Sequence, residues 1–162
     1  MNALRQRGGW LIFFSILTAL VLTALPTPGW AAVWQPAWVA LVLIYWCMAV
    51  PGRVGVGIGW VLGLVLDIHM GTLLGQHALG LSIMAYLAYY LHQRVRVHPL
   101  WQQGVTVFGL VMVYNTITLW INGILGRPVE FHAYLASPLV SMIIWPWVFI
   151  ILRDLARRYN VS

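Results

Sequence analysis

The side chains best suited to chemistry lie close together near the middle of the chain: Asp67, His69 and His77. An acid with two histidines has the composition of a metal site, but this spacing matches no established metal motif, so we predict no metal and no other cofactor. Asp67 lies in an apolar run, where an ionised carboxylate costs about 2.5 to 3.5 kcal/mol deep in a bilayer. We therefore expect Asp67 to face protein or an interface, as a structural carboxylate that binds backbone amides of the following glycine turn or caps the next helix. The alternative is that Asp67 takes part in proton or ion coupling.

The rest of the chain contains no recognisable arrangement of catalytic residues. No serine or cysteine has a positioned base, no acidic pair has useful spacing, and no glycine-rich phosphate loop follows a strand. We predict no catalytic residue and no enzyme activity. The polar side chains in or near apolar segments are interpreted as interhelical hydrogen-bonding or interface groups: Gln76, Asn115, Asn122, His132, Ser137 and Ser141.

Small residues recur every fourth position around the acid, giving Gly55, Gly59, Gly63, Asp67, Gly71 and Gly75. Such a stripe lets helix backbones approach closely where lipid supplies no hydrophobic drive. These six are our candidates for helix packing or partner binding, with internal packing favoured over docking of a partner's transmembrane helix. Asp67 and Gly71 are expected to shape the outer connection. Either interpretation predicts that Gly59→Leu separates a pair of helices.

The elements that hold these residues are apolar helices. The 162 residues are 62% hydrophobic and only 7% charged, so lipid must be the solvent for much of the surface. We predict an all-α integral membrane protein with a single membrane domain, residues 1–162. Six transmembrane helices are expected, at residues 10–25, 34–50, 54–68, 74–91, 101–121 and 134–152. The first is read as an uncleaved signal anchor, and one kinked or re-entrant element over 54–91 is the alternative to the third and fourth.

Arginine supports this count, because the positive-inside rule places it on alternate connections. With the N-terminus inside, eight arginines are cytoplasmic and only Arg127 is outside. Both termini are therefore expected in the cytoplasm. The net charge of +6 is attributed to this bias and to anionic lipid rather than to nucleic acid, since the arginines lie at span ends. Arg5 and Arg7 precede the first span, and the predicted cytoplasmic anchors are Arg53, Arg94, Arg96, Arg153, Arg157 and Arg158.

Several short motifs occur in a fixed order along nearly the whole chain: Pro36-x-Trp38, Tyr45-Trp46, Pro51-x-Arg53-Val54, Gly63 to Asp67, Gly71, Leu74-Gly75, Trp101-Gln102-Gln103 and Trp145-Pro146-Trp147. In this order, the chain resembles the MreD family of rod shape-determining membrane proteins in its proteobacterial form. The family motif carries over onto Gly63, Asp67, Gly71 and Gly75. The resemblance implies a fold like the six-helix S component of energy-coupling-factor transporters, and a place in the bacterial inner membrane.

The same resemblance implies partners. Such proteins bind MreC, which has one transmembrane helix and a periplasmic region, and work within the elongation (Rod) complex with MreB, RodA and a penicillin-binding transpeptidase. Our first hypothesis is thus a non-catalytic scaffold that helps regulate lateral peptidoglycan synthesis and rod shape. The alternative is a transporter-like subunit that binds a small molecule or lipid inside the bundle, which a pocket lined by Asp67, His77, Trp60 and Asn115 would favour.

Overall fold

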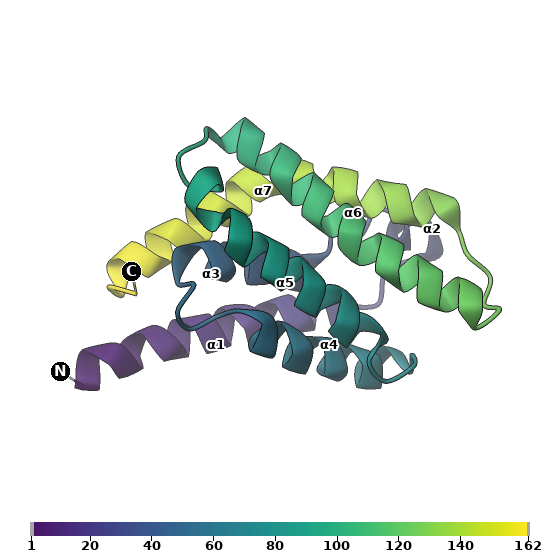
Figure 1. Cartoon of the computed structure of the whole chain (residues 1–162), viewed down its shortest axis with the longest axis horizontal. Helices are drawn as coiled ribbons and strands as arrows, with labels where there is room; N and C mark the ends of the chain where they lie inside the picture. Colours follow the sequence, from purple (N-terminus) through teal and green to yellow (C-terminus); the bar gives the residue numbers. More distant parts are fainter. Residues whose placement is uncertain (1, 162) are drawn as a thin grey trace.

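The computed structural model describes residues 2–161 and is helical throughout, with no strand among these residues (Figure 1). The predicted all-α class is confirmed. Seven helices follow one another along the chain: α1 (Asn2–Ala24), α2 (Gly29–Ala32), α3 (Trp38–Ala49), α4 (Val56–Met70), α5 (Gln76–Val95), α6 (Leu100–Ile124) and α7 (Phe131–Arg158). Six of them overlap the six apolar segments expected from the sequence, while α2 is a single turn within the expected loop.

Glycine and proline set the helix ends. Gly71, with φ of 64°, takes the left-handed conformation that ends α4, and α6 starts directly after Pro99. The segment expected to begin at residue 34 becomes helical only at Trp38. Pro36 accounts for this difference, because the residue before a proline is driven out of the helical region and proline itself donates no hydrogen bond.

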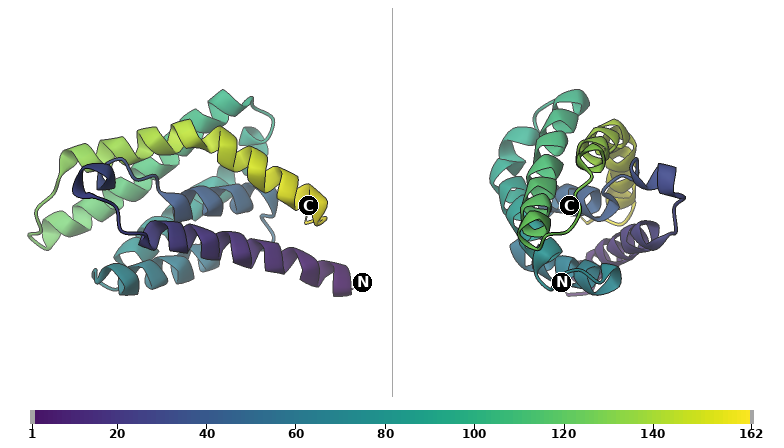
Figure 2. Two further views of the ribbon diagram at one scale, coloured as in Figure 1. Left: turned by 180° about the vertical axis from the view of Figure 1, so that it is seen from behind. Right: turned by 90° about the vertical axis from the view of Figure 1, so that its right-hand side faces the viewer.

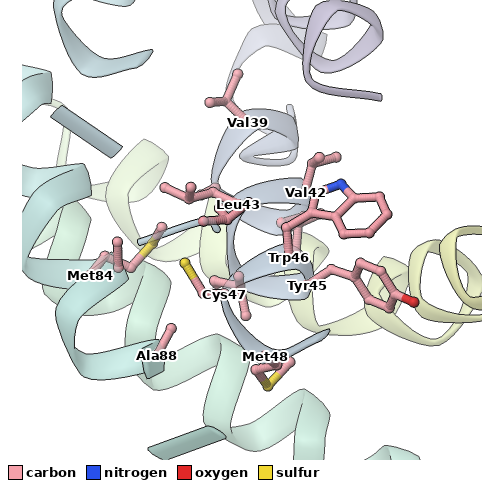
Figure 3. Close-up of a cluster of buried hydrophobic side chains, with 14 of the residues drawn as sticks. Val39, Val42, Leu43, Tyr45, Trp46, Cys47, Met48, Met84 and Ala88 are labelled. Carbon is pink, nitrogen blue, oxygen red and sulfur yellow. The ribbon is translucent and has the colours of Figure 1, made fainter. Parts of the chain in front are cut away.

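Helix α3 forms the centre of the molecule. Its residues from Val39 to Met48 are all buried, and it packs against α1, α5 and α7 (Figure 3). The indole N–H of Trp46 donates a 2.8 Å hydrogen bond to the hydroxyl of Ser15 on α1. A helix that is apolar on every side belongs inside a bundle, and α3 therefore holds the others in place.

Around α3, consecutive helices pair as α4 with α5 and α6 with α7. Helices α4 and α5 are two separate helices joined by a short turn rather than one kinked helix (Figure 1), and the choice between two crossings and a re-entrant pair stays a prediction. Both α6 and α7 are long and apolar enough to cross a membrane, whereas residues 8–24 and helices α3 and α4 are apolar but shorter. Six crossings of a bilayer stay a prediction.

The arginines gather at one end of the bundle. Both chain ends, the α3–α4 connection and the α5–α6 connection lie on the left of Figure 1, and the view from behind in Figure 2 agrees. Together these segments carry every arginine except Arg127, which lies in the α6–α7 connection at the opposite end. We call this side the arginine end and the other, which holds the α4–α5 turn, the Asp67 end.

Candidate functional site

Helices α4 and α5 approach so closely that only glycine fits between them. A Cβ atom at Gly63 would lie 2.1 Å from Cα and 2.3 Å from N of Ala78, and one at Gly59 would lie 3.0 Å from the carbonyl oxygen of Leu81. Both glycines are buried. Gly59 and Gly63 therefore lie where α4 and α5 pack closely against each other within this chain.

One turn beyond Gly63, the Asp67 carboxylate faces the first residues of α5. Its Oδ1 accepts hydrogen bonds from the Thr72 hydroxyl at 2.8 Å, the His77 amide at 2.9 Å and His77 Nδ1–H at 2.7 Å. Its Oδ2 accepts the Gly75 amide at 2.8 Å and a longer contact from the Ala78 amide at 3.4 Å. Asp67 thus caps α5 from the preceding helix, and its negative charge lies where the helix dipole favours an anion.

Two further glycines of the stripe, Gly71 and Gly75, shape this turn. Gly71 and Gly75 have φ of 64° and 102°, which disfavour any side chain, while the space around both is open. They let the chain reverse within five residues, so that the amides of α5 point back at Asp67. An added Cβ at Gly55 would likewise meet no atom within 4 Å, so no close helix approach requires glycine at that position.

A polar chain extends from this turn into α6 and α7. Gln76 Nε2 donates to Asn122 Oδ1 at 3.0 Å, and Asn122 Nδ2 donates to the Tyr134 hydroxyl at 2.9 Å. Asn115 Nδ2 donates to the Tyr134 carbonyl oxygen at 3.0 Å. That carbonyl lacks its usual helical donor because Pro138, four residues later, has no N–H. The interhelical role predicted for these amides holds for Gln76, Asn115 and Asn122.

This geometry argues for structure rather than catalysis. The side chain of Asp67 is 0% exposed and that of His77 is 9% exposed. Five contacts occupy the carboxylate, which leaves little capacity for a substrate or ion. The residues proposed to line a ligand pocket do not assemble either: Asn115 bonds to α7, and Trp60 is 44% exposed on α4.

Sequence reasoning missed Thr72 and Tyr134. Thr72 lies between the two turn glycines, where a hydroxyl close to an acid is a usable signal for local capping. Tyr134 gives no such signal, because its role depends on the packing of α6 against α7. His69 is exposed and is not among the hydrogen-bond partners of the Asp67 carboxylate.

A second feature is an apolar groove between α1 and α4, on the side of α4 away from α5. It has a volume of about 510 Å³ and is lined almost wholly by apolar side chains, with Arg53 near one end. Phe13 and Leu17 of α1 are 59% and 42% exposed, and Val61 and Val65 of α4 are 58% and 42% exposed. Because α1 packs mainly on α3 and α4 packs mainly on α5, neither helix closes the gap between them.

Comparison with known proteins gives a consistent result. A family model described as rod shape-determining protein MreD matches residues 4–155. The chain is 33% identical to the rod shape-determining protein MreD of Haemophilus influenzae over 151 residues, which are 93% of this chain and 92% of that protein. No solved structure matches.

Proposed function

Because this chain belongs to the MreD family of rod shape-determining proteins, we propose that it is a non-catalytic membrane scaffold of the bacterial elongation complex. In this proposal it binds MreC through transmembrane helices and so helps to regulate lateral peptidoglycan synthesis. RodA, MreB and the penicillin-binding transpeptidase belong to the larger assembly. The role in rod shape determination rests on the family, and the binding mechanism is our own inference.

The proposed topology is six crossings of the inner membrane with both termini in the cytoplasm. It is supported by the clustering of all arginines but Arg127 at one end of the bundle, as the positive-inside rule requires of cytoplasmic segments. The arginine end then faces the cytoplasm and the Asp67 end faces the periplasm. At 12 residues, α3 is only about 18 Å long, so its crossing is completed by the non-helical residues before it.

The observation that carries the binding proposal is the groove between α1 and α4. A bundle in lipid gains nothing from burying apolar groups as such, and helices associate there through close van der Waals packing. A concave surface between two helices provides such packing, whereas a flat lipid-facing surface does not. Gly9 lines the groove and has no atom within 4 Å of its absent Cβ, which gives a visiting backbone room to approach. We assign the groove to the single transmembrane helix of MreC.

The test is co-purification of MreC from native membranes with variants of α4. Val61→Trp would fill the groove, since Val61 lines it and is 58% exposed. Ile68→Trp is the matched control, because Ile68 is 70% exposed on the same helix and does not line the groove. We expect Val61→Trp to lose MreC and Ile68→Trp to retain it. Equal recovery with both variants would refute the assignment.

The alternative, a transporter-like subunit, has less support. A cavity of about 190 Å³ at the Asp67 end has polar side chains that include Gln35, Asn115 and Ser137. Pockets that bind small molecules usually hold about 300 to 1,000 Å³, so this one is too small for most ligands. The structural role of Asp67 also removes the charged group on which ligand coupling would have depended.

A further inference from the structure

A cavity of about 410 Å³ opens at the arginine end, between the ends of α3 and α7 and the α5–α6 connection. Its walls are apolar and aromatic, with Trp46 and Phe149 among them, and three guanidinium groups line it. Arg96 comes from the end of α5, and Arg153 and Arg157 come from adjacent turns of α7. Its volume falls within the range of about 300 to 1,000 Å³ typical of ligand pockets.

Little negative charge balances these three arginines. Asp154 is the one acid at this end, and its Oδ1 lies 3.9 Å from Nε of Arg153, with the two side chains 59% and 41% exposed. A contact so long and so solvated contributes little. Asp67 and Glu130 belong to the opposite end of the bundle. The cavity therefore keeps a net positive charge next to low-dielectric walls, which is the condition that concentrates an anion.

Two of the residues that line the cavity, Arg153 and Tyr45, are held in place by packing against Phe149. Nε of Arg153 is buried and has no hydrogen-bond partner among the described residues, while its guanidinium lies 5.6 Å from the centre of the Phe149 ring. Tyr45 is 5% exposed and packs edge-on against Phe149 at 5.7 Å. In Figure 3 its side chain extends from α3 toward α7, with the hydroxyl at its tip. A buried donor without a partner is energetically costly, and an anion close to the guanidinium lowers that cost.

We propose that this cavity binds the phosphate-containing headgroup of an anionic membrane lipid. Arginine presents a planar fork of donors that matches phosphate oxygens, and several forks around one phosphate bind it more strongly than separate surface charges. The apolar walls accept the glycerol and the first part of the acyl chains. This inference goes beyond the scaffold proposal and depends only on membrane location, so loss of MreC binding would leave it standing.

The test compares two double variants that remove the same charge. Arg96→Gln with Arg157→Gln changes two exposed arginines that line the cavity, and Arg94→Gln with Arg158→Gln changes two exposed arginines of the same end that do not. Full-length protein is placed in phosphatidylcholine nanodiscs that contain a small fraction of phosphatidylglycerol or cardiolipin. Native mass spectrometry then counts the anionic lipids that each protein retains.

We expect the cavity variant to retain about tenfold less anionic lipid than the wild type, because each lost contact is charge-assisted, and the control variant to resemble the wild type. Equal losses in both variants would mean general surface charge, and no loss in either would mean no site; both results overturn the proposal. Stabilisation by inorganic phosphate without any lipid preference would overturn the lipid assignment. If the cavity variant fails to fold, Tyr45→Phe takes its place, and retention unchanged in that variant would count against the site.

Discussion

Gly63→Ala is the sharpest test of the contact between α4 and α5. The added Cβ would lie 2.1 Å from Cα of Ala78 and 2.3 Å from its N, and both are backbone atoms that no change of rotamer can move. The helices must separate by about 1.3 Å here before the nearest distance reaches 3.4 Å, the lower limit of ordinary contact. The added methyl group therefore pushes the backbones of α4 and α5 apart.

The separation also reaches Asp67, one turn along the same face. Its bonds to the Gly75 and His77 amides, now 2.8 and 2.9 Å, would lengthen to about 4 Å, which is too long for a hydrogen bond. Overpacking costs about 1 to 3 kcal/mol, and a hydrogen bond to a charged group contributes about 1.5 to 3 kcal/mol. The higher helix propensity of alanine offsets about 1 kcal/mol of this loss. Since these effects overlap, we expect a net loss of about 3 kcal/mol.

The assay is equilibrium unfolding of the full-length protein in mild detergent, titrated with a denaturing detergent and followed by tryptophan fluorescence. Gly57→Ala is the matched control, because Gly57 is exposed on the same helix with no atom within 4 Å of the new Cβ. It should be neutral or more stable by up to about 1 kcal/mol. If Gly63→Ala unfolds within about 0.5 kcal/mol of Gly57→Ala, the close approach of the two helices is wrong.

Three further changes test the same architecture by the same unfolding assay. Asp67→Asn replaces one acceptor oxygen by a donor, so an amide of α5 loses its partner. We expect the free energy of unfolding to fall by about 2 to 4 kcal/mol, whereas the exposed control Asp154→Asn should not change it. Equal stability of the two variants would contradict the capping role. Gly75→Ala forces a side chain into φ of 102° and should cost about 1 to 2 kcal/mol; a neutral result would mean that the turn has another conformation. Ser15→Ala removes the acceptor of the fully buried Trp46 indole and should lower the free energy of unfolding by about 1 to 3 kcal/mol. We also expect a shift in tryptophan emission; an unchanged emission spectrum would mean that the α1–α3 contact does not form.

Hydropathy located six of the seven helices, and proline or glycine lies within a few residues of most helix ends, although the C-terminal end of α7 at Arg158 has neither. The four-residue spacing also identified Gly59, Gly63 and Asp67 as one face. Spacing could not separate these from Gly55, which lies just outside α4 as its N-cap and whose absent Cβ meets no atom within 4 Å. Nor could it bring Arg96 next to Arg153 and Arg157, because residues more than fifty positions apart meet only through the packing of three helices.

The contacts of Asp67 have a consequence for biosynthesis. Every donor to its carboxylate comes from residues 72–78, which are synthesised directly after it. An isolated Asp67 carboxylate would be costly to transfer into lipid. Its hydrogen bonds to residues 72–78 can form as soon as the first turn of α5 folds. In the six-crossing topology proposed above, α4 and α5 can therefore enter the membrane as a pair before α6 and α7 are made.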